Sequence, residues 1–340
     1  MEIKNGSQLA VQRLTALWAL NECGLGGVLH ALQVPFKGLF IGGFAVIIIS
    51  LICVVSKDKK RSLIMAWMVV MSVKLILSPH TSPVAYIAVT FQAFTGLFLF
   101  ALVSSPYLAA MLLSIIAMLQ SAMQKIIVLS LLFGKSIWDA IDEWGIWVGE
   151  IMGFWIQTSS SLWLISIYTG IYFVGGIVIG HIAGRLTHTV FEDWEKTRFR
   201  LTLDKYHQLN ITFNRRKNRY RSLLILSILL LLIIITLLIR TEGDAAWFDA
   251  LKVVSRVVAI VFIWFAWVAP FIARFFHKYF VRKSGEYSQE ISQTMELLPY
   301  IAWIIKRAWK DSGSHGWVQK IPFFFRLVIM YVLLFKMEEE

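Results

Sequence analysis

A small set of charged and amide side chains lies inside stretches that are otherwise apolar. The ionisable members are Glu22, Lys74, Lys125 and Glu150, and the amides are Asn21, Gln92, Gln120 and Gln124. An ionisable group in hydrocarbon is costly, so it either pairs with another charge or faces a polar cavity. Two interpretations therefore stay open. The two acids and two bases neutralise one another, or all eight residues line an outward-facing cavity that binds a small polar solute.

Catalysis finds little support in the residue spacing. The sequence has neither a paired-histidine metalloprotease motif nor a Gly-x-Ser-x-Gly elbow. Gly134-Lys135-Ser136 resembles the end of a phosphate-binding loop but lacks the glycine five residues earlier. Cys23 and Cys53 both fall in apolar segments, which predicts neither a disulfide framework nor a thiolate metal site. We therefore predict a protein that is not an enzyme and that uses no cofactor or metal.

The elements that carry these residues are predicted to be membrane-spanning helices. Hydrophobic residues make up 58% of the chain and charged residues 16%, with a mean hydropathy of +0.68, whereas soluble domains carry about 25% charged residues. The apolar residues form runs long enough to cross a bilayer, which takes about 20 helical residues. These runs cover residues 8–32, 38–55, 62–78, 83–103, 106–133, 158–183, 222–239, 253–276 and 321–335. The fold class predicted is all-α, a polytopic transmembrane bundle of about nine spans.

Lysine and arginine are distributed unevenly over the connections between these runs. Residues 57–61, 185–221 and 278–283 are basic, while the alternate connections are nearly free of positive charge. Because basic loops stay on the cytoplasmic side, we expect an integral cytoplasmic or inner membrane protein with a cytoplasmic N-terminus. The net charge of +12 is then explained by topology and anionic lipid, with the bilayer rather than nucleic acid as partner.

The polar stretch after the sixth run is the best internal boundary. We predict a six-span bundle over residues 1–186, a basic cytoplasmic loop or helix over 187–221 and a three-span part over 222–340. The last part contains an amphipathic cytoplasmic segment, 286–311, which Pro299 should break or kink. This segment either lies on the cytoplasmic leaflet or docks a soluble partner.

The first predicted helix carries a ridge of small side chains. Its members recur every four residues and are Thr15, Ala19, Cys23, Gly27 and Ala31. Helices associate in lipid through such small residues, because their backbones can approach closely. The ridge is therefore a packing face, either against helices of the same chain or against another subunit.

A family resemblance rests on this ridge and on two neighbouring features. These are the turn Val34-Pro35-Phe36-Lys37-Gly38, followed by a span with Gly42-Gly43, and the six-span count. Residues 1 to about 185 resemble the substrate-binding component of energy-coupling factor transporters. The resemblance implies six helices with both ends cytoplasmic, and a first helix whose small-residue face contacts a transmembrane coupling subunit.

The part from residue 222 on is similar in outline to that coupling subunit. It lacks the family's Ala-Arg-Gly signature, and Lys306-Arg307-Ala308 is the nearest approach to it. The resemblance implies that separate cytosolic ATPase subunits, or other membrane subunits, are partners.

Two functional hypotheses follow. The first is a membrane transport component that takes up a small polar solute. The second is a non-catalytic structural or assembly subunit of a larger membrane complex, in which the buried charges pair and the helix ridge is a contact surface. No motif supports a third possibility, a membrane enzyme that acts on lipids.

Overall fold

The computed structural model is built from helices. It describes residues 2–26, 36–78, 83–153, 159–194, 202–203, 254–255, 257–260, 262–263, 267, 271, 274, 285, 287–314 and 317–337. The longer helices are α1 (Glu2–Leu20), α3 (Lys37–Val55), α4 (Lys59–Leu77), α5 (Pro83–Leu102), α6 (Pro106–Phe133), α7 (Ser136–Met152), α8 (Ser160–Trp194), α12 (Ser288–Asp311) and α13 (Trp317–Leu334). A π-helical turn, η1 (Asn21–Leu25), continues α1, and a 3-10 turn, η4 (Ser312–Ser314), follows α12. Two residues of β1 (Thr202–Leu203) pair in parallel with two of β2 (Lys336–Met337).

Four helices are long and apolar enough to cross a membrane. They are Lys37–Val55, Val84–Leu102, Pro106–Phe133 and Ser160–Val190. The prediction of a helical protein with membrane-spanning segments is confirmed. The predicted count of nine spans is not confirmed. Two of the predicted spans, 222–239 and most of 253–276, lie outside the described residues. Three others correspond to α1, α4 and α13, which are helical but are not among the four candidate spans.

Apolar side chains on the outer faces of these helices form continuous stripes. On α5 the exposed ones are Ile87, Phe91, Phe94, Phe98 and Leu102, and on α8 they include Ile167, Ile171, Val174 and Val178. The spacing of three and four residues puts each set on one face of its helix. A soluble monomer rarely exposes apolar patches of this extent. The stripes therefore fit helices whose surroundings are lipid.

The chain divides into two compact units. The first comprises Met1–Gln124, Ile167–Leu209 and Ile272–Glu340, and the second Lys125–Ser166 and Asn210–Phe271. The first unit thus joins the N-terminal helices to α12 and α13. The described part of the second is the end of α6, all of α7, the first residues of α8 and a few residues between 254 and 271.

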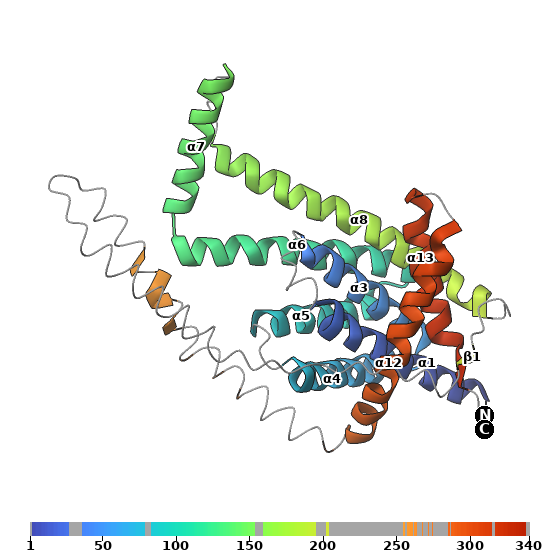
Figure 1. Ribbon diagram of the computed structural model, residues 1–340. Coiled ribbons are helices and arrows are strands. Elements are labelled where there is room, and N and C mark those ends of the chain that lie inside the picture. Colours follow the sequence, from blue (N-terminus) through green and yellow to red (C-terminus); the bar gives the residue numbers. More distant parts are fainter. Residues whose placement is uncertain are drawn as a thin grey trace. The chain divides into compact units, whose positions relative to one another are not determined.

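Helix α1 is the enclosed element of the first unit. It packs against α3, α4, α12 and α13 (Figure 1). Thr15, Ala19 and Cys23 of the predicted ridge are all buried, whereas Gly27 and Ala31 lie outside the described residues. The described part of the ridge is therefore covered by helices of this same chain.

Helix α12 provides part of that cover. It runs unbroken through Pro299, so the predicted division into two pieces is wrong. Its apolar residues, among them Leu298 and Ile301, are buried. Polar contacts fix the C-terminal helices on α1: the Gln12 amide nitrogen donates to the Gln293 amide oxygen over 2.9 Å, and the Arg13 guanidinium donates to the Leu333 carbonyl over 2.6 Å. The apolar side of this amphipathic segment is used inside the unit.

A second small-residue stripe, which the sequence analysis overlooked, joins α8 to α6. Gly176, Gly180 and Gly184 recur every four residues on α8. A Cβ atom added at Gly176 would lie 3.0 Å from the Ile115 Cα atom, and one added at Gly180 would lie 2.9 Å from the Met111 Cα atom. The neighbouring atoms are backbone and cannot turn aside, so these glycines set the distance between the two helices.

We predict that Gly180→Ala destabilises the protein, because the added methyl group overpacks the contact with α6 at a cost of about 1–3 kcal/mol. Gly170→Ala on the same helix is the matched control, since a Cβ there meets nothing within 4 Å. It should stabilise the protein by about 0.4–1 kcal/mol. The measurement is the thermal midpoint of each purified variant in detergent. Equal midpoints for the two variants would contradict the close approach of α6 and α8.

Candidate functional site

Polar groups from four helical segments converge on the first turns of α3. The backbone of α3 is open there, because Gly38 and Gly42 lie one turn apart and carry no side chains. The π-helical turn η1 approaches this stretch through Asn21, and α5 approaches it through Gln92. Ser121 of α6 and Tyr172 of α8 complete the set. All of these residues belong to the first unit.

Asn21 is fixed by one hydrogen bond and keeps one acceptor free. The side chain is only 2% exposed, and its amide nitrogen donates to the Ile41 carbonyl over 3.0 Å. Its Oδ1 atom accepts no hydrogen bond from the protein. The wider π turn directs Asn21, Glu22 and Cys23, three consecutive residues, into the interior. Such turns inside α-helices often occur at functional sites.

Gln92 presents a second buried acceptor close to the same turn of α3. It is 3% exposed, and its Oε1 atom has no hydrogen-bond partner in the protein. A Cβ atom added at Gly42 would lie 3.0 Å from Gln92 Nε2, 3.1 Å from the Met118 methyl group and 3.8 Å from Ser121 Oγ. Gly42 is therefore the position at which α5 and α6 meet α3, and a side chain there would displace the Gln92 amide.

Aromatic rings lie at the start of α3. The Phe36 ring stacks on Tyr168 at 5.9 Å between centroids, with Tyr172 at 6.0 Å, and the Tyr168 and Tyr172 rings are 5.1 Å apart. Phe36 has a φ of 56°, a left-handed conformation that is unfavourable for a bulky residue. Strain of this kind is often held at ligand sites. The Tyr172 hydroxyl would be 3.5 Å from a Cβ at Gly38, so the rings adjoin the polar group.

The buried charges of the first unit form an ion pair. Glu22 Oε2 accepts a hydrogen bond from Lys74 Nζ over 2.6 Å, and both side chains are almost fully buried. The Tyr86 ring lies 5.6 Å from the same ammonium group. The pair joins η1 to α4 next to Asn21. Neither charge is left over, so this part of the site is electrically neutral.

The remaining predicted site residues divide between the two units. Gln120 donates to Gln124 over 3.0 Å along one face of α6, and Gln120 Oε1 has no protein partner. Both amides belong to the first unit. Lys125 and Glu150 belong to the second unit, and both are exposed.

No protein-family model, no curated protein and no solved structure matches this chain. Its functional interpretation depends on the chemistry of these residues. Within the described ranges, no three His, Cys, Asp or Glu side chains gather in a way that could hold a metal ion.

The chemistry that this group offers is recognition of a neutral polar molecule. Free amide oxygens of Asn21 and Gln92 accept hydrogen bonds, and the rings of Phe36, Tyr168 and Tyr172 provide flat apolar surface. A buried polar atom without a partner is costly, about 1–3 kcal/mol each. A ligand with N–H or O–H groups would supply the missing bonds.

Several of these residues were missed from the sequence alone. Ser121, Tyr168 and Tyr172 have no charge to mark them within their apolar segments, and their importance comes from α3 approaching them. Phe36 was noticed only as part of a turn. The one available signal was the pair of glycines at residues 38 and 42, whose missing side chains leave room for polar groups from neighbouring helices.

We predict that Lys74→Met lowers stability by about 3–5 kcal/mol, because Glu22 is then left buried without its partner. The double variant Glu22→Gln with Lys74→Met should recover most of this loss, since no charge remains. The measurement is a double-mutant cycle of thermal unfolding in detergent. Lys60→Met, at an exposed position of α4, should change stability by less than about 0.5 kcal/mol. If the losses of stability in Glu22→Gln alone and Lys74→Met alone simply add up in the double variant, the pairing is contradicted.

Proposed function

We propose that this chain is a membrane transport component that takes up a small, neutral, planar solute, which it binds around Gly38 and Gly42 of α3. The observation that carries the proposal is the pair of buried oxygens, Asn21 Oδ1 and Gln92 Oε1, that accept no hydrogen bond from the protein. The Asn21 side chain is hydrogen-bonded to the Ile41 carbonyl of α3, and the Gln92 side chain lies next to Gly42 of the same helix.

The electrostatics favour an uncharged solute. Glu22 and Lys74 neutralise each other, so the site offers acceptors and no unpaired charge close to Asn21. The cluster of Phe36, Tyr168 and Tyr172 favours a flat molecule, since offset stacking on aromatic surface is attractive. Nucleobases and heterocyclic vitamins have this combination of a planar ring and N–H donors.

The resemblance to energy-coupling factor transporters suggests how the two ends of the chain would cooperate. In that family, the small-residue face of the first helix contacts the coupling subunit. Here the corresponding helix, α1, is covered by α12 and α13 of the same chain. This supports a chain that combines a solute-binding part with a coupling part, has a cytoplasmic N-terminus and works with separate cytosolic ATPase subunits.

The second hypothesis, a structural or assembly subunit, is favoured by one observation. The Glu22–Lys74 ion pair stabilises the helix bundle without any ligand, which is what a purely structural role requires. The two hypotheses differ in the partner that purifies with the protein. A transport component retains a small solute, whereas an assembly subunit retains another membrane protein in mild detergent.

We expect the purified full-length chain to release a small heterocyclic molecule that mass spectrometry detects after denaturation. One member of a panel of neutral vitamins and nucleobases should raise the thermal midpoint, because it binds only the folded protein. Gln92→Leu should abolish this shift and leave the fold intact, since it removes the free amide oxygen at similar volume.

Ser114→Ala is the matched control for Gln92→Leu. Ser114 Oγ is another buried atom without a protein partner, but it lies two turns before Ser121 on α6, about 10 Å along the helix. Its loss should leave the ligand shift unchanged. No ligand in the purified protein and no shift across the panel would refute the proposal.

A further inference from the structure

Helix α7 of the second unit has three different faces. At 100° per residue, Ile137, Ile141, Trp144, Val148 and Ile151 fall on one side. The acids Asp139, Glu143 and Glu150 fall on the opposite side and are exposed. Gly145 and Gly149, which are buried, lie between the two. The sequence analysis treated this segment as a bare connection, because its four acids and two glycines interrupt the apolar run.

The glycine face holds α7 against its neighbours. Asp142 accepts hydrogen bonds from the Ser161 backbone N–H over 2.6 Å and from the Ser161 hydroxyl over 3.0 Å, at the first turn of α8. The carboxylate therefore caps this helix N-terminus. At the other end, the Trp138 indole N–H donates to the Ser130 hydroxyl of α6 over 3.1 Å. These contacts use the third face, and none of them involves the apolar face.

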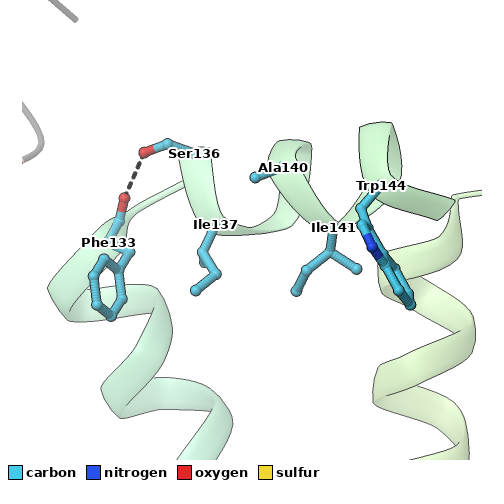
Figure 2. Close-up of a pocket in the computed structure, with 6 residues that line it drawn as sticks. All are labelled: Phe133, Ser136, Ile137, Ala140, Ile141 and Trp144. Atoms are coloured by element: carbon cyan, nitrogen blue, oxygen red, sulfur yellow. Dashed lines mark hydrogen bonds between the residues drawn. The ribbon is translucent and has the colours of Figure 1, made fainter. Parts of the chain in front are cut away.

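That apolar face, together with the end of α6, lines a shallow, open hollow of about 380 Å³. It is lined by Phe133, Ser136, Ile137, Ala140, Ile141 and Trp144 (Figure 2). The side chains of Phe133, Ile137, Ile141 and Trp144 point to the same side of α7. The Ser136 hydroxyl donates to the Phe133 carbonyl over 2.7 Å, so it has no proton to offer a ligand. The hollow suits a hydrocarbon chain.

We propose that α7 lies in the boundary between headgroups and acyl chains of a bilayer, and that the hollow holds an acyl chain of a zwitterionic phospholipid. Apolar surface continues from α7 onto the helices before and after it, and both are long and apolar enough to span a membrane. With 28 residues, α6 is about 42 Å long, which reaches the polar layer of a bilayer about 40–45 Å thick.

Charge and aromatic content select the type of lipid. Helix α7 has four acids, and Lys135 at its N-terminus pairs with one of them, Asp139, over 3.8 Å. The net charge of the helix and its N-cap is therefore negative, which disfavours an anionic headgroup, whereas a zwitterionic headgroup carries no net charge. Trp144 and Trp147 are both mostly exposed, and exposed tryptophan is typical of the membrane interface. With its apolar face in the acyl region, α7 presents its acids to water.

Accessibility of spin labels tests the placement of α7. Cys23 and Cys53, which are free and buried, are first replaced by alanine, and single cysteines are then introduced as Ile141→Cys and Glu143→Cys. Each variant of the full chain is labelled with a nitroxide in bilayers of dioleoylphosphatidylcholine. We expect the label at 141 to collide several-fold more with oxygen than with a water-soluble nickel chelate, and the label at 143 to show the reverse.

A fluorophore on the same two cysteines tests the hollow. Phosphatidylcholine with a spin label at mid-chain should quench the fluorophore at 141 and spare the one at 143. Ala140→Trp, which fills the hollow, should reduce the quenching at 141 and preserve the oxygen and nickel contrast. Each labelled variant is compared only if its thermal midpoint equals that of the protein that lacks Cys23 and Cys53, which shows that its fold is intact.

Three outcomes would overturn the proposal. Nickel access at both positions would place α7 in water. Protection of position 141 from both reagents, with spin–spin broadening, would place it in a contact between two copies of the chain. Quenching at 141 that Ala140→Trp leaves unchanged would show that the acyl chain does not enter the hollow.

Discussion

Polar side chains enclosed by apolar helices need partners, and this requirement governs the first unit. Lipid offers no hydrogen bonds, so each buried polar atom must be satisfied by the protein or by a ligand. Several are satisfied locally: the hydroxyl groups of Thr15, Ser50 and Ser72 each donate to the carbonyl four residues earlier in their own helix. Glu22 and Lys74 satisfy each other across two helical segments.

Buried polar atoms without a protein partner occur at several places among the described residues, including Trp18 Nε1, Ser114 Oγ and Gln120 Oε1. Asn21 Oδ1 and Gln92 Oε1 adjoin the glycine turns of α3, and Thr169 Oγ1 lies on the same stretch of α8 as Tyr168 and Tyr172. A bundle selected only for stability would replace such atoms by hydrocarbon, because a buried acceptor without a donor lowers stability. The acceptors of Asn21 and Gln92 are the two that adjoin the α3 glycines, and the proposal of solute binding rests on this pair.

Much of the helical framework could be predicted from the sequence, because helix length and hydropathy are local properties. The run predicted at 106–133 is α6 at the same residues, and that at 38–55 differs from α3 by one residue. Helix α7 was missed because its four acids and two glycines interrupt the apolar run and lower the mean hydropathy of the segment. Pro299 also misled as a helix breaker, since α12 continues through it and is buried on its apolar side against other helices.

The site was less predictable, for a physical reason. Charge and amide character marked Asn21, Glu22, Lys74 and Gln92, since polar groups stand out in apolar runs. Which of them meet depends on helix packing, and packing is set by glycines whose effect is to allow approach. The sequence left open whether the four charges pair or line a cavity. Glu22 and Lys74 do pair, while Lys125 and Glu150 belong to the second unit.

The glycine contacts connect stability with binding. Gly176, Gly180 and Gly184 bring α8 onto the backbone of α6, and α8 carries Tyr172 while α6 carries Ser121. Both side chains reach Gly38 only because the two helices are held close together. A change in the spacing of α6 and α8 would therefore move two walls of the site at once. Helix α1 is fixed separately, by the Glu22–Lys74 pair on one side and by α12 and α13 on another. Asn21 belongs to the turn that continues α1, and the Phe325 ring of α13 lies 5.2 Å from the Phe44 ring of α3. A movement of the C-terminal helices would therefore reach the site through both α1 and α3.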